Sequence, residues 1–379
     1  MPSPIPLSVL DLVPIASGST AATALRNTVD LAQRAEAAGY ARYWIAEHHL
    51  NPGVAGVAPA LVVSLVAAAT EHIRVGSGAV QLGHHTPLSV VEQFGIVDAL
   101  HPGRIDLGLG RSGFRRPPPP GADAPDVAPG FTTPRGLVIP AKPSLGALLR
   151  SPRYAAQRTL LQQPNAETPP YEEQIAEILA LLRGEYRSDD GYPVSATPGE
   201  GAQVEIWILG SSGGDSATLA GELGLRFGAN YHVSPATVLE AVEAYRAAFR
   251  PSTALSKPHV LVSADVVVAP DDATARELAT GYALWVLSIR NGQGAIDFPT
   301  PKEAAAHEWS ADELDLVADR TATQFVGSPS TVADQLQVLA DETGADELLI
   351  TTITHDHADR VRSYELLARE WAQRAAASG

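Results

Sequence analysis

Eight short runs of apolar and β-branched residues recur along this 379-residue chain, separated mostly by stretches with helical periodicity. The runs are residues 5–12, 43–46, 73–82, 104–109, 204–209, 226–230, 259–268 and 347–352. Strands that alternate with helices form parallel sheets. Eight such strands close naturally into a barrel. The pattern therefore predicts the α/β class and a single (β/α)8 TIM-barrel domain over residues 1–379.

Two segments interrupt the alternation. Residues 115–170, after the fourth strand, contain the run Pro117–Pro120 and are far longer than an ordinary strand-to-helix connection. This Pro-rich insertion is either a disordered surface segment or an ordered excursion that covers the site, because it leaves from the carboxyl end of a strand. Residues 291–309, after the seventh helix, hold Gly292, Gly294 and two prolines and are predicted to form a mobile lid loop.

Composition excludes several classes of partner. The formal net charge of −16 disfavours nucleic acid and anionic membrane surfaces, since both attract basic proteins. The chain has no cysteine, which excludes disulfides, thiolate metal ligands and cysteine catalysis. It also shows no secretory signal pattern and no apolar segment long enough to cross a membrane. We expect a cytoplasmic enzyme that acts on a small molecule.

The strand at residues 43–46 ends abruptly in three ionisable residues, Glu47, His48 and His49. Just beyond them, Asn51 and the Pro-Gly pair that follows break regular structure. In a barrel the carboxyl ends of the strands converge on the catalytic face. These three side chains are therefore the first candidates for catalysis. The alternative is that Glu47 and His48 only satisfy polar partners inside the barrel.

A glycine-rich run at residues 108–113 matches the pattern G-x-G-x-x-G. That pattern binds a dinucleotide only if a helix begins within it, whereas Arg115 and a proline run follow here. A nicotinamide-binding fold is therefore not predicted. Gly110, Arg111 and Ser112 remain a place where an anionic ligand could approach the backbone.

A second glycine-rich run, residues 210–214, follows a strand and opens a helix. Backbone N–H groups at a helix start, with the hydroxyls of Ser211 and Ser212, form an anion cradle. A flexible turn with a serine cap is the alternative. Asp215 would repel a phosphate at this place unless it caps the helix and points away.

Seven histidines fall near the predicted carboxyl face, which raises the possibility of a metal site. They are His48, His49, His84, His85, His232, His355 and His357. Only the last two have a spacing typical of metal ligands, and they lie in a turn-like stretch that favours solvated side chains. No metal site is predicted, and a metal-dependent barrel hydrolase stays as an alternative.

Taken together, the strand ends resemble those of the bacterial luciferase-like flavin-dependent oxidoreductases over nearly the whole chain. The segments that carry the resemblance are residues 44–49, 74–80, 104–111, 209–212, 326–329 and 344–348. The order and spacing of these segments are specific, although no single one is.

The resemblance implies a barrel that binds reduced FMN, supplied by a separate reductase, and that forms a homodimer. It further implies that O2 and the flavin form a C4a-peroxyflavin that oxidises a small, apolar organic substrate. Three alternatives remain. One is an F420-dependent dehydrogenase or reductase, although this acidic chain shows no basic groove for the tail of that cofactor. The others are a catalytically silent flavin-binding subunit and the metal-dependent hydrolase.

By position, the resemblance implies that His48 lies beside the flavin ring, with Glu47 or His49 orienting it. It also implies a cis peptide bond beneath the ring between Gly78 and Ala79. Arg111 and Ser212 match phosphate-binding positions, whereas Ser211 and Asp215 depart from the family pattern. The predicted cofactor-binding residues are Gly78, Ala79, Gly110, Arg111, Ser112, Gly210, Ser211, Ser212 and Asn230.

Overall fold

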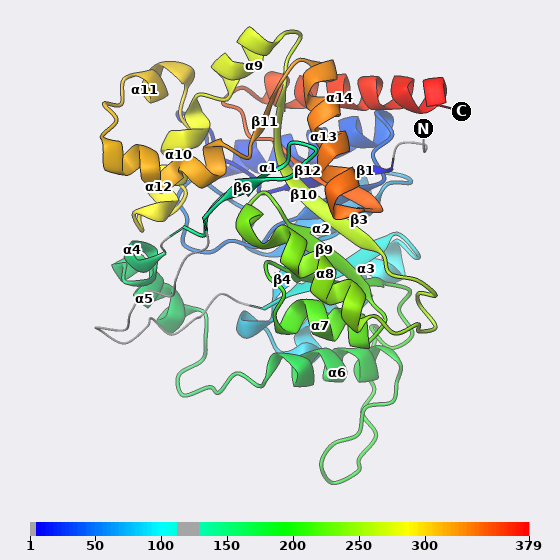
Figure 1. Ribbon diagram of the computed structural model, residues 1–379. Helices are drawn as coiled ribbons and strands as arrows, with labels where there is room; N and C mark the ends of the chain where they lie inside the picture. Colours follow the sequence, from blue (N-terminus) through cyan, green and yellow to red (C-terminus); the bar gives the residue numbers. More distant parts are fainter. Residues whose placement is uncertain (1–4, 112–128, 144, 379) are drawn as a thin grey trace.

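The structure is a computed structural model that describes residues 5–111, 129–143 and 145–378. Eight parallel strands form a closed barrel in which each strand pairs with the next and β12 pairs back with β1 (Figure 1). The barrel strands are β1 (Leu7–Asp11), β2 (Arg42–Ile45), β3 (Arg74–Ser77), β5 (Ile105–Gly110), β8 (Glu205–Gly210), β9 (Arg226–Asn230), β10 (Val260–Val268) and β12 (Glu347–Thr351). The predicted α/β barrel is confirmed.

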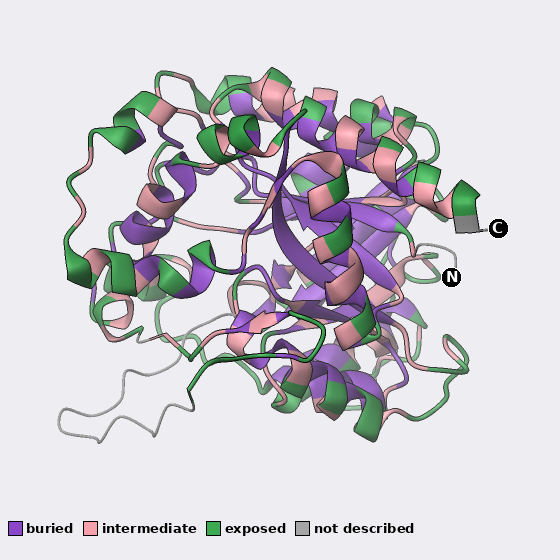
Figure 2. Cartoon of the chain, turned by 45° about the horizontal axis from the view of Figure 1, so that its top comes forward, coloured by how far each residue is buried: buried purple, intermediate pink, exposed green. Residues whose placement is uncertain are grey.

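Helices surround the barrel and turn their buried faces toward it (Figure 2). They are α1 (Ala21–Ala37), α2 (Pro59–Ala69), α3 (Pro87–Leu100), α6 (Tyr171–Leu182), α7 (Asp215–Glu222), α8 (Val238–Ala248), α13 (Pro329–Thr343) and α14 (His357–Ser378). In α1, for example, Thr20 caps the first turn, and Ala24, Leu31 and Ala35 form the buried stripe. Within the described residues, no helix is both long and apolar enough to span a bilayer.

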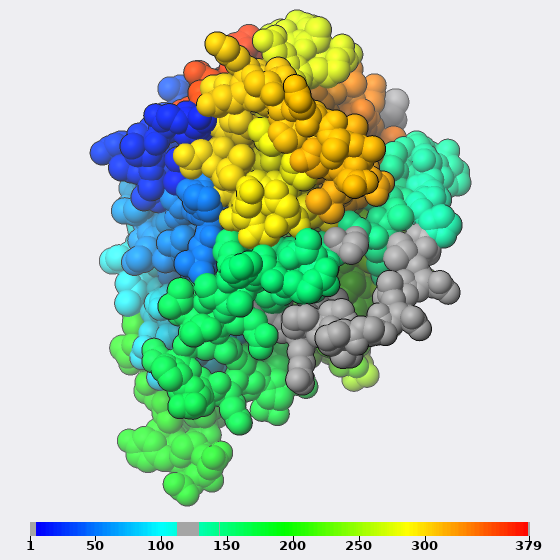
Figure 3. Space-filling view, turned by 90° about the vertical axis from the view of Figure 1, so that its left-hand side faces the viewer, coloured from blue at the N-terminus to red at the C-terminus, as the bar shows by residue number. Residues whose placement is uncertain are grey.

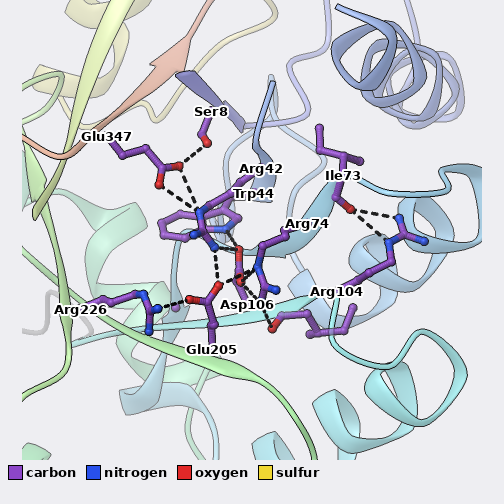
Figure 4. Close-up of polar contacts among 12 residues, drawn as sticks. Ser8, Arg42, Trp44, Ile73, Arg74, Arg104, Asp106, Glu205, Arg226 and Glu347 are labelled. Atoms are coloured by element: carbon purple, nitrogen blue, oxygen red, sulfur yellow. Dashed lines mark hydrogen bonds and ion pairs between the residues drawn. The ribbon is translucent and has the colours of Figure 1, made fainter. Parts of the chain in front are cut away.

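Charged side chains fill the amino end of the barrel (Figure 4). Arg42 contacts Asp106 and Glu205 at 2.9 Å each and Glu347 at 3.1 Å. The next layer up is apolar and includes Trp44 of β2, which is fully buried. These ion-paired side chains, called the ionic plug below, fill the amino end of the barrel and close it to ligands. The carboxyl end is therefore the end where a ligand can bind.

Four details of the secondary structure differ from the prediction. The third predicted strand is divided into β3 and a short β4 (Val80–Gln81), which pairs with β5 alone. The stretch of helical periodicity after β10, residues 271–289, forms two helices and not one, α9 (Asp272–Leu278) and α10 (Gly281–Arg290). The sequence analysis also missed α12 (Ala311–Thr321) and β11 (Phe325–Gly327), which pairs in parallel with the last three residues of β10.

The described part of the Pro-rich insertion has regular structure, so the disordered interpretation is wrong for it. It contains the hairpin of β6 (Phe131–Thr132) and β7 (Val138–Ile139), then α4 (Gly146–Leu149) and α5 (Pro152–Leu160). Figure 1 shows α4 and α5 beside α10 and α12, on the left, where the barrel strands end. The ordered interpretation, an excursion over the carboxyl face, fits this placement. Residues 112–128, which include the predicted Ser112, lie outside the described residues.

The predicted lid loop, residues 291–309, is irregular except for the short helix α11 (Pro301–Ala305). Backbone hydrogen bonds tie its first part to neighbouring loops. The Phe298 N–H donates to Ile15 O at 2.7 Å, and the Gly53 N–H donates to Ala295 O at 2.7 Å. The segment therefore lies against the loops that follow β1 and β2, beside the predicted site.

Candidate active site

Glu47, just beyond β2, is a buried carboxylate with three hydrogen-bond donors. Its Oε1 accepts from His49 Nε2 at 2.7 Å and from His85 Nε2 at 2.9 Å, and its Oε2 accepts from the Gln81 N–H at 2.9 Å. Burial raises the pKa of Glu47, but the hydrogen bonds outweigh it and lower the pKa to about 2. Glu47 is therefore an anion at neutral pH, and it holds both imidazoles through their Nε2–H groups.

His48 is the neighbouring imidazole that Glu47 does not bind. Its Nδ1 is buried and has no hydrogen-bond partner among the described residues. Burial lowers the pKa of His48 to about 4; Glu47 opposes this shift, whereas His49 and Arg153 add to it. The side chain is therefore neutral at pH 7, with one nitrogen that can donate and one that can accept. An inaccessible nitrogen without a partner at the mouth of a barrel points to a ligand.

A second polar group lies within electrostatic reach of His48, near the ends of β9 and β10. His232 Nδ1 is hydrogen-bonded to Ser263 Oγ, and burial, with Arg320 and His48, holds the pKa of His232 well below its usual range. Arg320 donates to Asp265 Oδ2 at 3.0 Å, a buried pair. Apart from His232, the sequence analysis did not weigh these residues. The sequence did hold a signal for them. Ser263 and Asp265 alternate within the β-branched run of β10, so both side chains point to the same face of the strand.

The predicted anion cradle forms where β5 and β8 end. Arg111 Nη1 contacts Asp215 Oδ2 at 2.7 Å, and the Gly213 N–H donates to Glu240 Oε1 at 3.2 Å. Asn230 Nδ2 donates to Ser211 Oγ at 3.0 Å, which brings β8 and β9 together here. Two donors of the cradle are thus held by carboxylates of the chain itself. A bound phosphate would take the place of these carboxylates.

Strand β4 joins the Glu47 group to this cradle, because Gln81 lies in register with Gly110. The peptide bond between Gly78 and Ala79 is cis, as the resemblance implies. A Cβ on Gly110 would lie 3.2 Å from Ala79 Cβ, so these small residues are neighbours. Gly210 has a different role: a Cβ there would lie 3.0 Å from the Phe227 ring, so its size serves packing.

A cavity of about 320 Å³ lies beside Arg111. Arg158 of α5 and Gln174 of α6 also line it, and the buried Gln174 Oε1 has no hydrogen-bond partner in the described part of the chain. The insertion therefore contributes a second guanidinium close to the predicted phosphate site. The sequence analysis named neither residue.

The two histidines with metal-like spacing do not converge. His355 Nε2 is 3.0 Å from Ser17 O, whereas His357 Nε2 is 2.9 Å from Asp30 Oδ2 on α1. Across residues 5–111, 129–143 and 145–378, no three His, Asp or Glu side chains gather as a metal site would require.

Comparison with known proteins was made on sequence and on structure. The family model described as luciferase-like monooxygenase matches residues 5–123 and 171–347. The chain is 38% identical over 370 residues to YvbT, an uncharacterised protein of Bacillus subtilis, with 97% of each covered. It is 33% identical to a luciferase-like monooxygenase of Escherichia coli, with 96% of each covered. It is 28% identical to the N-acetyl-S-alkylcysteine monooxygenase of B. subtilis, which covers 96% of this chain and 97% of that one.

Solved structures share the whole fold. Apo-MsnO8 superposes with a TM-score of 0.79 at 31% identity and covers 98% of each chain. The oxygenating component of 3,6-diketocamphane monooxygenase from Pseudomonas putida, in complex with FMN, gives 0.66 at 19% identity and covers 98% of this chain and 99% of that one. The F420-dependent tetrahydromethanopterin reductase of Methanopyrus kandleri gives 0.60 at 16% identity, with the same coverage. The last two likenesses concern the fold alone.

Proposed function

Because this chain belongs to the luciferase-like monooxygenase family, we propose that it uses reduced FMN and O2 to oxidise a small organic molecule. Membership makes the protein an oxidoreductase. The observation that carries the more specific proposal is His48, a neutral imidazole with a buried Nδ1 that no described residue satisfies.

The residues present fit a flavin mononucleotide. At one end of the site, His48 offers a nitrogen to a polar edge of the flavin ring, and the cis peptide of Gly78 lies close to the end of β2, because the Gly78 N–H donates to Ile45 O at 2.8 Å. At the other end, Arg111 and the start of α7 offer donors to a phosphate. Reduced FMN, when bound, supplies the electrons that activate O2.

The chain's own residues would then orient the reactants and exclude water from them. Glu47 fixes His49 and His85, and these two rings with the Gln81 backbone frame the site beside His48. His48 can donate or accept a proton at the reacting edge of the ring, because it is neutral at pH 7. Apolar side chains that include Trp285, Phe298 and Ile353 form the buried cluster near the barrel mouth and exclude water.

We favour FMN over F420 because the formal net charge of −16 opposes the binding of a long anionic tail. The supply of reduced FMN by a separate reductase, assembly as a homodimer and a cytoplasmic location also belong to this proposal. The family resemblance supports the reductase and the homodimer, and the sequence pattern supports the location. The B. subtilis relative named as an N-acetyl-S-alkylcysteine monooxygenase lends support to oxygenation of a small molecule.

Stopped-flow oxidation of the flavin tests the proposal. Protein saturated with reduced FMN is mixed with oxygenated buffer, and flavin absorbance is followed beside a protein-free control. We expect reduced flavin to react with O2 faster in the protein than free in solution but to regain the absorbance of oxidised flavin more slowly, and His48→Ala to change these rates, because the site excludes water and controls the proton. Reoxidation at the rate of free flavin would refute oxygen activation at this site.

A further inference from the structure

Arg153 lies in the first turn of α5, where the insertion meets the barrel mouth. Its Nε donates only a long hydrogen bond, 3.4 Å, to Gly292 O. A Cβ on Gly294 would lie 2.9 Å from that Nε and 2.8 Å from Asn51 Oδ1, so the guanidinium borders the loop after β2. Figure 3 shows this face, with the green of the insertion against the yellow of the segment after α10.

Asn51 connects this position to the catalytic candidates. Its Nδ2 donates to His49 O at 2.9 Å, and its Oδ1 accepts from the Ala295 N–H at 2.9 Å. The charge of Arg153 also acts on His48, whose pKa it helps to lower. The guanidinium is therefore directed at the same mouth that His48 occupies.

Arg153 differs from most buried or half-buried arginines of the described chain because it contacts no carboxylate. Seven of the others contact one: Arg42, Arg74, Arg226, Arg290, Arg320, Arg360 and Arg374. Arg104 is the other exception, but its donors are bonded to Thr70 and to backbone carbonyls. Arg153 is half-buried, and among the residues that the structure describes it contacts no carboxylate at all. A guanidinium has five N–H donors in a planar fork. In Arg153 only the Nε–H donor has a partner among the described residues, through the 3.4 Å bond to Gly292 O, although the chain has 43 acidic residues.

We propose that Arg153 binds the carboxylate of the substrate, which is therefore an organic acid. A carboxylate held by the fork of Arg153 directs the rest of the molecule toward His48. This inference rests on the proposed function, and it adds a charge requirement to the apolar substrate that the family resemblance implies. It also gives the insertion a role: it supplies a specificity determinant to the site.

The phosphate of the flavin is the competing occupant. The cradle at Arg111 lies at the ends of β5 and β8, whereas Arg153 lies against the loop after β2. In the barrel, β3 stands between β2 and β5. The two arginines therefore serve different parts of the site, and the phosphate belongs to Arg111.

The test compares charged probes with neutral ones of the same shape. Linear carboxylates from butanoate to decanoate, benzoate, and the matched primary amides are titrated into the protein by calorimetry, with and without FMN. A charge-assisted hydrogen bond contributes about 1.5–3 kcal/mol, so we expect the best carboxylate to bind roughly 10- to 100-fold more tightly than its amide. Arg153→Gln should remove this preference, and Arg153→Lys should keep part of it. Arg150→Gln, at an exposed arginine of the same segment, is the control and should retain it.

Two outcomes would overturn the proposal. The first is a wild-type protein that shows no carboxylate preference in any pair, or that keeps its preference in Arg153→Gln. The second is an Arg153→Gln variant that binds FMN more weakly but riboflavin normally, which would assign Arg153 to the phosphate. Failure of the wild-type protein to bind FMN would contradict the proposed function instead, and the flavin-free titrations would still decide the role of Arg153.

Discussion

At the scale of single residues, Glu47 organises the site through its charge. Its pKa of about 2 lies below the ordinary value of 4.5, so its stabilising effect is complete above about pH 5 and is lost as the pH falls toward 2. The shift corresponds to about 3 kcal/mol. We expect Glu47→Gln to lower the free energy of unfolding at pH 7 by that order and to flatten its fall between pH 5 and 3.

Urea unfolding at a series of pH values measures this effect. Glu173→Gln, at an exposed carboxylate of α6, is the matched control and should follow the wild-type curve. If Glu47→Gln kept the wild-type pH dependence, the carboxylate would not be the ionised acceptor described here.

His48 differs from Glu47, because in the proposed function it acts in the reaction and does not stabilise the fold. We expect His48→Ala to lower substrate-dependent oxygen consumption by roughly 10²- to 10⁴-fold, the range of general acid–base catalysis. The dissociation constant for reduced FMN should change far less, because the imidazole contacts one edge of a large ligand. Steady-state oxygen electrode rates and equilibrium titrations separate the two quantities. Unchanged turnover would remove His48 from the mechanism.

Sequence reasoning located the residues at strand ends, but it considered His85 only as a possible metal ligand and did not name Arg153. Glu47, His48 and His49 follow a buried strand directly, so their position on the carboxyl face could be predicted. His85 reaches Glu47 from 38 residues away, and Arg153 comes from a segment with little periodicity. Only the tertiary structure brings these two side chains to the site.

At the scale of elements, we expect the start of α7 to determine how well a phosphate binds. Asp215 pairs with Arg111 in the position where a phosphate would approach, and it repels that group. Both side chains are largely exposed, so the effect is modest. We expect Asp215→Asn to tighten FMN binding about fivefold, the order of a solvent-screened charge interaction, and to leave riboflavin binding unchanged.

Equilibrium titrations at low and high salt check this prediction, and the gain should shrink as salt screens the charge. Asp189→Asn, at an exposed aspartate outside α7, controls for the change in net charge. Equal effects on FMN and riboflavin would place the phosphate elsewhere.

Element boundaries were predictable where local signals agreed. The sequence analysis gave β9 with its observed bounds, because apolar pattern and flanking residues coincide there. It missed α12, although Ser310 and Glu313 form a capping box that the sequence spells out. It also merged β3 and β4 into one strand, since an apolar run does not reveal where its pairing changes.

At the scale of the whole molecule, the ionic plug at the amino end ties five strands of the barrel together. Arg42 of β2 bonds to carboxylates on β5, β8 and β12, and Glu347 also accepts from Ser8 on β1 (Figure 4). Removing the guanidinium would leave three carboxylates with reduced compensation. We expect Arg42→Met to destabilise the protein by about 3–5 kcal/mol.

Chemical unfolding gives this value directly. Arg34→Met provides the contrast, because Arg34 and Asp30 form an exposed pair at 3.6 Å that should contribute less than about 1 kcal/mol. If both variants lost a similar, small amount of unfolding free energy, the ion pairs of Arg42 would fill the amino end without stabilising the closed barrel.

The most direct test of the central claim is an anaerobic titration of the purified protein with reduced FMN and, separately, with reduced F420. Our account predicts that reduced FMN binds more tightly than F420, and that Arg111→Ala weakens FMN binding while leaving riboflavin binding intact. Preference for F420 would replace oxygen activation with hydride transfer. Binding of neither cofactor would contradict the account and leave the site around His48 without its proposed ligand.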